Sequence, residues 1–544
     1  MRYSLIGSIA SGLRTCFLNE GFFIGILTIF CIQFGLLWTN LIAQTNKKKT
    51  VRNIFIKRQD VFPEITGKPR FLYNWANSLH IVTKESVIRQ ELLFEPGDEY
   101  DPELLQESER NLRALAYFGD VEVFVKREEA EFVDVAVVTQ DQWSTLVSYI
   151  FNQGGGRTEF GGSIEEFNLL GLGKRIFSEI RYEQSEGTTF TLRYSDPQLF
   201  FTRWTTEETL ITGPFIQSFS AEVIRPFFAL DTKWAGGVSG NVTDRTIRLF
   251  DSGEETSRLR LETQGFQILG GRAFGSRFRK TRLQLTYRFQ ERVFISLGDL
   301  TTSPVPDDEL IHALTLTARK ENISFVEEKR IDRFVKTEDL TLGNISSLSL
   351  GRTGLPIPKG VTRFELNART RQAYRFSVGQ YLIAIFGFQT LFDKDTIASL
   401  RLQYYNKLLA QQTFAFNLEF DFGEDLEESR QFLLGGDSGL RGFPAREFTG
   451  DKRLLINIED RIFTPLKILT VALGGVVFLD AGNVWRPDEA INLSDMNFSV
   501  GFGLRLGYTK SPNSRVGRFD FGLPLNRGGG FGVSIGVDQH FSIN

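Results

Sequence analysis

Residues 435–443 read GGDSGLRGF, a glycine-rich stretch that carries one arginine, Arg441. It lies between two segments in which apolar and polar residues alternate, 413–422 and 454–463. Successive side chains of a β-strand point to opposite faces, so each segment predicts a strand with one apolar and one polar face. The sequence therefore predicts a loop between two amphipathic strands, with Arg441 directed towards an acidic partner on a neighbouring polar face.

The composition favours β-structure. The 544 residues include 51 Phe and 51 Gly but only 2 Met and 2 Cys, and aromatic residues and glycines suit strands and tight turns better than helices. The net charge is −3, so no overall positive field argues for nucleic-acid binding. Because His80, His312 and His540 lie far apart in the sequence, we expect no metal site and no cofactor.

Residues 1–43 have the pattern of a secretory signal peptide. An uncharged apolar run at 21–38 follows Arg2 and Arg14 and precedes the small residue Ala43. Cleavage near Ala43 would leave a mature chain without cysteine, since both cysteines precede that point. The alternative is an uncleaved anchor, because such a run is nearly long enough to span a bilayer.

After a linker at 44–50, residues 51–142 predict a small α+β domain. The expected order is a strand, a helix after Thr83, a second helix after Asp101, and two final strands. Asp101 is a favourable helix cap, and Pro102 is suited to the first turn. The final strands are marked by alternating valines: Val121, Val123 and Val125, then Val133, Val135 and Val137. We expect one sheet with both helices on one face.

Residues 143–544 predict a transmembrane antiparallel β-barrel. Alternation is clearest at 497–508, and it recurs from Phe531 to Phe541. Aromatic-rich alternating segments of about ten residues are typical of membrane barrels, which must close so that no backbone edge meets lipid. The pattern alone gives about 16 to 20 strands, within the range known for such barrels.

Two carboxylates on the strands after the loop are candidate partners of Arg441. Glu459 lies on the polar face of the next strand, and Asp480 lies in 478–482, which reads FLDAG. If the loop at 435–447 folds into the barrel lumen, we expect Arg441 to meet both carboxylates, because a guanidinium favours bidentate pairing. Gly442 would allow the loop backbone to approach the barrel wall.

The ordered set of LRGF at 440–443, Glu459 and FLDAG at 478–482 resembles the BamA/TamA family of outer-membrane assembly proteins, also called bacterial surface antigens. Residues 92–125 resemble a POTRA domain. The resemblance implies a barrel of 16 strands in the outer membrane of a Gram-negative bacterium, with one periplasmic POTRA domain. It also implies that a set of loop and wall residues holds the loop: Arg441, Gly442, Phe443, Glu459, Phe478, Asp480 and Gly482.

The resemblance further implies a role in inserting proteins into the outer membrane. The expected partners are the lipid bilayer, unfolded outer-membrane or secreted polypeptides, and periplasmic or lipoprotein factors. Clients would add a strand to the edge of the POTRA sheet. That edge is placed at Val121, Val123 and Val125. A weak seam is expected beside the terminal strand, the alternative being glycines that only ease packing or curvature. Its residues are Gly532, Gly536 and Phe541.

Other functions stay open at this stage. The barrel would also suit a polypeptide secretion pore of the two-partner type or a passive diffusion channel, and the POTRA domain would also suit a rigid spacer. Assembly proteins usually carry several POTRA domains, whereas this chain has room for one. We find no Ser/His/Asp arrangement and no phosphate-binding loop, so we do not expect an enzyme. The net charge of −3 gives no reason to expect a nucleic-acid-binding protein.

Overall fold

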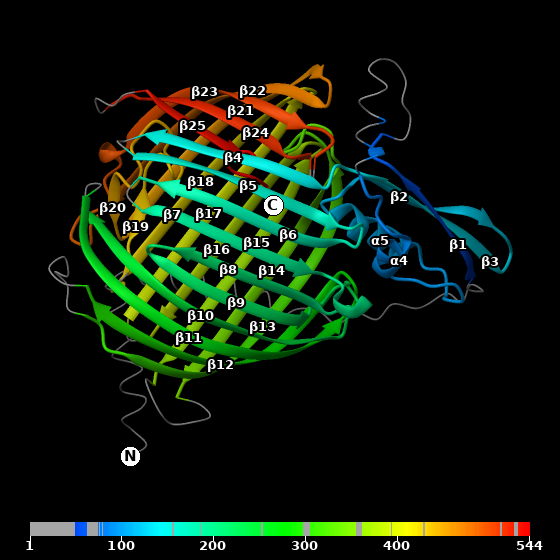
Figure 1. Ribbon diagram of the computed structural model, residues 1–544, viewed down its shortest axis with the longest axis horizontal. Helices are drawn as coiled ribbons and strands as arrows, with labels where there is room; N and C mark the ends of the chain where they lie inside the picture. The colour runs from blue at the N-terminus through cyan, green and yellow to red at the C-terminus, as the bar shows by residue number, and fades with distance from the viewer. Residues whose placement is uncertain are drawn as a thin grey trace. The chain divides into compact units, whose positions relative to one another are not determined.

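The computed structural model describes residues 49–543, with gaps at 63–73, 75–76, 79, 155–156, 185, 252–253, 298–304, 355–361, 393, 428–429, 512–513 and 527–530. The predicted signal peptide and most of the predicted linker lie outside the described residues. No helix in the described part of the chain is long and apolar enough to cross a membrane. The strands form a three-stranded sheet, a closed barrel and a two-stranded hairpin (Figure 1).

The N-terminal domain has the order β1 (Thr50–Gln59), α4 (Glu85–Glu91), α5 (Pro102–Ala114), β2 (Phe118–Glu128) and β3 (Phe132–Asp141). Its strands lie in the order β1-β3-β2, with β1 parallel and β2 antiparallel to β3. Asp101 caps α5, since its side chain accepts a hydrogen bond from the Glu103 amide at 2.8 Å. Ile88 and Leu112 are fully buried against the valines of the sheet, so both helices cover one face.

The barrel contains twenty strands, and the expectation of 16 is wrong. The strands are β4 (Thr145–Gly154), β5 (Arg157–Leu169), β6 (Lys174–Glu183), β7 (Gly187–Asp196), β8 (Thr205–Gly213), β9 (Ile216–Arg225), β10 (Trp234–Asp251), β11 (Glu254–Gly275), β12 (Arg279–Ser296), β13 (Glu309–Glu328), β14 (Glu338–Thr353), β15 (Phe364–Ser377), β16 (Gln380–Leu391), β17 (Lys394–Leu409), β18 (Gln412–Glu424), β21 (Lys452–Ile468), β22 (Val471–Trp485), β23 (Asn497–Tyr508), β24 (Val516–Pro524) and β25 (Gly532–Val537). The number 16 came from the family resemblance. Strands such as β10, which reads WAGGVSGNVTDRTIRLFD, carry glycine and polar residues on both faces. Alternation of apolar and polar residues therefore does not reveal these strands in the sequence.

The barrel closes through a short contact between its last and first strands. β25 pairs with β24 at six positions but with β4 at only two, Val533 with Gln153 and Ser534 with Asn152. By contrast, β4 pairs with β5 at ten positions. In the described part of the chain, the residues of β4 from Thr145 to Phe151 therefore have no partner strand on the β25 side.

The N-terminal domain lies at one end of the barrel (Figure 1), where its residues contact several turns. In α5, Arg113 forms ion pairs with Glu327 at 2.6 Å and Asp339 at 2.8 Å, at the two stems of the β13–β14 hairpin. Arg203, in the β7–β8 turn, donates to the Leu92 carbonyl after α4. The Asn168 side chain, near the end of β5, donates to Thr83 at 2.8 Å. A side chain of α5 and the residues on either side of α4 therefore hold the domain against the barrel.

Candidate functional site

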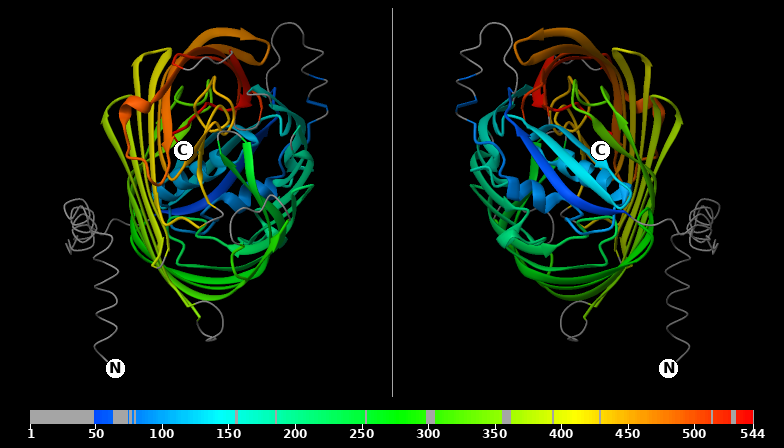
Figure 2. Two further views of the ribbon diagram at one scale, coloured as in Figure 1. Left: turned by 90° about the vertical axis from the view of Figure 1, so that its left-hand side faces the viewer. Right: turned by 90° about the vertical axis from the view of Figure 1, so that its right-hand side faces the viewer.

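The loop between β18 and β21 folds into the barrel from the end opposite these turns. Its base is a small hairpin of β19 (Phe432–Leu434) and β20 (Phe448–Gly450), drawn in orange inside the ring of strands in Figure 2. Gly442 has a φ of 91°, which favours glycine. A Cβ at Gly442 would lie 2.9 Å from the backbone carbon of Gly522. The loop therefore touches the barrel wall at a point where both backbones need glycine.

Arg441 is fully enclosed by acidic and aromatic side chains. Its Nε donates to Asp480 Oδ2 and its Nη2 to Asp480 Oδ1, both at 2.8 Å. Its Nη1 donates to Glu459 Oε1 at 2.7 Å. The guanidinium carbon lies 3.5 Å from the centre of the Phe478 ring, and only 2% of Arg441 is exposed. The structure thus brings Arg441 together with both of the carboxylates expected to meet it.

The remaining predicted lock residues also lie at this site. Phe443 is buried in an apolar cluster with Leu434 and Leu455. A Cβ at Gly482 would lie 2.7 Å from Leu434, so this position also needs glycine. The packing of Phe443 and the ion pairs of Arg441 therefore hold neighbouring residues of the same loop. All seven predicted lock residues are therefore at or next to the contact between loop and wall.

The charge pairing continues beyond the lock. The second oxygen of Glu459 accepts from Arg461 Nε at 2.9 Å, and Arg461 Nη1 donates to Asp332 at 2.8 Å. Asp332 belongs to the β13–β14 hairpin, whose stems contact α5. A second buried pair joins Arg505 and Asp520 at 2.6 Å. Alternating charges therefore run through the lumen from the loop to the opposite end of the barrel.

Sequence reasoning did not assign these further residues. Arg461 shares the polar face of β21 with Glu459, so alternation offered a signal for it. Asp332 offered none, because it lies 129 residues from Arg461 in a turn.

The predicted client edge differs in detail from the expectation. β2 is an edge strand of the N-terminal sheet. However, Val121 and Val123 are buried and Val125 packs against the same core, so these side chains face the helices. The outward side chain between them, Phe124, is 45% exposed. A partner at this edge would meet the β2 backbone and residues such as Phe124, and would not meet the valines.

The predicted seam residues do not share one role. A Cβ at Gly532 would lie 2.8 Å from Gly442, and one at Gly536 would lie 2.9 Å from an Arg518 nitrogen. Both glycines therefore leave space in the lumen, the first for the loop backbone and the second for the Arg518 side chain. Phe541 does not belong to the terminal strand, which corrects its placement in the seam. β25 ends at Val537, Asp538 takes a left-handed backbone with φ of 70°, and the chain then turns into the lumen.

A second group of buried polar atoms joins the N-terminal domain to the barrel. Asp141 Oδ2 accepts hydrogen bonds from the Thr83 amide and hydroxyl, both at 2.8 Å, and Thr83 in turn accepts from Asn168. Burial raises the pKa of Asp141 to about 6, against the opposing effect of the two Thr83 hydrogen bonds. In α5, burial also raises the pKa of Glu107, which accepts from the Leu230 amide.

Two family models match this sequence. Residues 371–543 match the Omp85 superfamily domain, and residues 78–140 match POTRA, described as a surface antigen variable number repeat. The chain carries an Omp85 superfamily domain and a POTRA domain. The Omp85 match covers every residue of the arginine lock and the segment after β25. The resemblance found in the sequence is therefore confirmed at this level.

The solved structures that are similar to this one include the following three. BamA from Haemophilus ducreyi lacking POTRA domains 1–3 is 12% identical, with 90% of this chain and 84% of that chain covered and a TM-score of 0.37. CdiB from Acinetobacter baumannii is 14% identical, with 90% and 74% covered and a TM-score of 0.45. CdiB from Escherichia coli is 11% identical, with 93% of each chain covered and a TM-score of 0.34. A comparison with curated proteins found no match.

Proposed function

We propose that this Omp85 protein lies in the outer membrane of a Gram-negative bacterium, with its POTRA domain in the periplasm, and assists the insertion of other β-barrel proteins. The observation that carries this proposal is the closure between β25 and β4. Two paired positions close the barrel there, while most of β4 offers backbone donors and acceptors to an incoming strand. An unpaired strand edge is a ready template for strand addition.

The arginine lock serves this function without doing chemistry. Arg441 pairs with both Glu459 and Asp480, so the charges of the three side chains are used in holding one another. We assign them the task of holding the loop against β24 and β25 through Gly442, which touches both Gly522 and Gly532. The short closure then has a rigid support on its lumen side.

The POTRA domain would deliver unfolded clients to this edge. β2 is an edge strand with an exposed aromatic side chain, which suits strand addition by an extended polypeptide. Slower amide exchange in β2 after an unfolded barrel protein is added would support this role. Unchanged exchange in β2 would favour a spacer role.

The main test is insertion of an unfolded β-barrel client into liposomes that contain this protein. We expect faster insertion than in empty liposomes. A disulfide between Asn152→Cys and Ser534→Cys, with Cys16 and Cys31 replaced by serine, should abolish the acceleration. A matched disulfide between Thr209→Cys and Ser220→Cys, which face each other on β8 and β9, should not. Acceleration that survives the first disulfide would refute the proposed role of the closure.

A polypeptide secretion pore or diffusion channel is the second candidate. Its supporting observation is a polar lumen cavity of about 350 Å³, lined by charged residues that include Arg288, Arg292 and Glu309. Steady conductance in planar bilayers, together with no effect on client insertion, would favour this alternative.

A further inference from the structure

The segment after β25 occupies a site inside the barrel. Its first residue, Asp538, leaves the strand direction and pairs with Arg333 of the β13–β14 hairpin. The following residues, 539–543, are called the tail here. Arg505 and Arg518, on β23 and β24, donate to the side chains of Gln539 and His540. The tail then reaches the wall formed by β14 to β18.

Side chains of the barrel form hydrogen bonds with the tail backbone, as the backbone of a neighbouring strand would do in a sheet. Arg461 Nη2 donates to the Phe541 carbonyl at 2.5 Å, and Gln403 Nε2 donates to the Ser542 carbonyl at 3.1 Å. The Ile543 amide donates to Asp332 Oδ2 at 2.9 Å. Each of these partners contacts a main-chain atom, so none of the three bonds depends on the side chains of the bound segment.

Two side-chain positions add selectivity. The Arg461 guanidinium carbon lies 4.7 Å from the centre of the Phe541 ring. Ile543 is 4% exposed and lies in an apolar pocket. The pocket is formed by Ile331, Leu340, Ala373, Tyr381, Ile383, Tyr405 and Ala415. Phe541 also packs against this cluster, so the site selects an aromatic and an aliphatic residue two positions apart.

The site does not depend on the tail for its shape. Arg461 and Asp332 bind each other, and Glu459 holds Arg461 from the other side. The hairpin that carries Asp332 is fixed by Phe334, whose ring lies 4.9 Å from that of Phe463. Arg461 and Asp332 therefore have partners of their own that do not belong to the tail.

The tail leaves one buried polar atom in the pocket unsatisfied. The Tyr405 hydroxyl is buried and has no hydrogen-bond partner in the described part of the chain. Native proteins pair nearly all such groups, and a lone one marks a position where a ligand can add a bond. The tail is thus an adequate occupant of the pocket, and a peptide with an acceptor near Tyr405 would fit it better.

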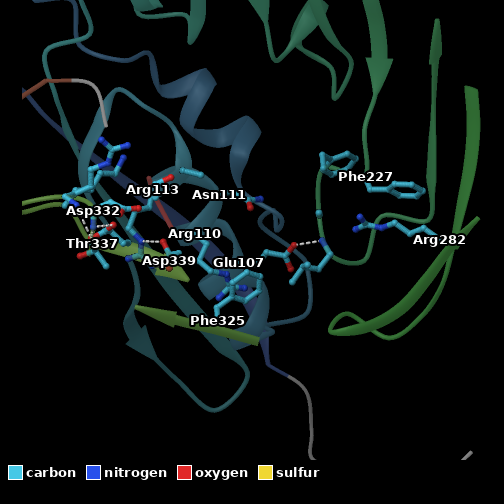
Figure 3. Close-up of a pocket in the computed structure, with 18 residues that line it drawn as sticks. Glu107, Arg110, Asn111, Arg113, Phe227, Arg282, Phe325, Asp332, Thr337 and Asp339 are labelled. Carbon is cyan, nitrogen blue, oxygen red and sulfur yellow. Dashed lines mark hydrogen bonds and ion pairs between the residues drawn. The ribbon is translucent and has the colours of Figure 1, made fainter. Parts of the chain in front are cut away.

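A cavity of about 530 Å³ connects this site with the POTRA domain (Figure 3). Ser542 and Asp332 line it on the tail side, and Glu107 and Arg110 of α5 line it on the other side. Figure 3 shows the α5 residues across from Phe227 and Arg282 of the barrel. An extended chain delivered by the POTRA domain therefore has space to reach the tail site.

We propose that this lumen site is a receptor for extended polypeptide segments with an aromatic-x-aliphatic pattern, and that the tail occupies it until a client segment takes its place. The inference rests on the proposed function, because strands of β-barrel clients present aromatic and aliphatic residues on alternate positions. It goes further by assigning a binding site within the lumen, separate from the strand edge of β4.

The test measures binding of a fluorescent peptide with the sequence of residues 536–544, GVDQHFSIN, to the detergent-solubilised protein. Two variants empty the site: one ends at Val537, and the other carries Phe541→Ser with Ile543→Ser in the full-length chain. We expect saturable binding to both, and at least about tenfold weaker binding to the unaltered protein, whose tail competes. Absence of binding to both variants, each with the barrel intact by heat-modified gel mobility, would overturn the proposal.

Matched peptides and protein variants test whether the site selects the aromatic and the aliphatic side chain. A peptide with both Phe541 and Ile543 replaced by serine should bind at least about tenfold more weakly, since it lacks both apolar contacts. Gln403→Ala should weaken binding up to about tenfold, whereas Tyr405→Phe should not, because the hydroxyl makes no bond to the tail. Equal binding of the serine peptide would contradict a selective site.

A competition experiment with a strand peptide distinguishes a receptor for clients from a site that binds only the protein's own tail. An unlabelled peptide with the sequence of residues 498–506, FSVGFGLRL, should compete with the labelled peptide. Failure to compete would mean that the site serves the tail alone and would overturn the receptor role. Client insertion into liposomes is measured separately. Insertion without peptide binding refutes only this inference, and peptide binding without insertion refutes only the proposed assembly function.

Discussion

Arg441 and Asp480 meet through two parallel hydrogen bonds, Nε to Oδ2 and Nη2 to Oδ1, each 2.8 Å long. Both side chains are at most 2% exposed. Such a pair gives direction as well as attraction, because the planar guanidinium accepts the carboxylate in one orientation. The pair therefore fixes the orientation of Arg441 where the loop meets the wall.

Arg441→Ala should release the loop. The substitution leaves Glu459 and Asp480 facing each other without their shared cation, and removing one partner of a buried pair costs about 3–5 kcal/mol. We expect faster protease cleavage within 435–443. Arg446→Ala in the same loop is the control, since Arg446 pairs with Glu186 at 22% exposure and should have a small effect. Equal cleavage of the Arg441 variant and the unaltered protein would show that the apolar cluster suffices.

Gly442→Ala should disturb the contact between loop and wall. The new Cβ would lie 2.9 Å from the backbone of Gly522. In addition, the φ of 91° at this position costs a non-glycine residue about 1–2 kcal/mol of stability. We expect a lower unfolding temperature in detergent. Gly270→Ala is the matched control, because a Cβ there meets no atom within 4 Å. A normal unfolding temperature for the Gly442 variant would indicate that the wall yields at this point.

The stability of the POTRA domain should fall as pH rises from about 4 to about 6. Burial raises the pKa of Asp141 from 3.8 to about 6, so the folded domain binds more protons than the unfolded chain in this window. A shift of about two units corresponds to at most about 3 kcal/mol. Amide exchange of the POTRA core in the full-length protein measures it. Asp141→Asn keeps an acceptor for Thr83 and should make the stability of the domain nearly independent of pH between about 4 and about 6. If the stability of this variant still falls over that range, another group causes the dependence.

Arg113→Ala should loosen the POTRA domain from the barrel. Arg113 is 8% exposed and joins α5 to Glu327 and Asp339, so its loss leaves Asp339 without this partner. We expect faster cleavage between the two domains, near residues 142–144. Arg89→Ala is the control on α4, because its exposed pair with Glu85 contributes little. Similar cleavage rates for the two variants would show that the hydrogen bonds at Thr83 and Arg203 hold the domain.

The arginine lock was predictable because a strand places alternate residues on one face. Once the loop was assigned to the lumen, that rule directed Glu459 and Asp480 to the side that Arg441 faces. The rule failed at Phe541, whose spacing fits a longer terminal strand. The left-handed turn at Asp538 and the side-chain partners of the tail carbonyls arise from tertiary contacts, which local alternation does not report. The role of Asp332 was hidden for the same reason.

The unequal strand lengths have a consequence for the lipid around the barrel. β11 has 22 residues and β13 has 20, whereas β25 has six and β24 has nine. At about 3.3 Å per residue, β25 spans roughly 20 Å, less than the hydrocarbon thickness of about 30 Å. A bilayer adapts to a short span by thinning locally. Acyl chains would therefore be most disordered beside β25 and β4, the place where the proposed function has a new strand enter the membrane.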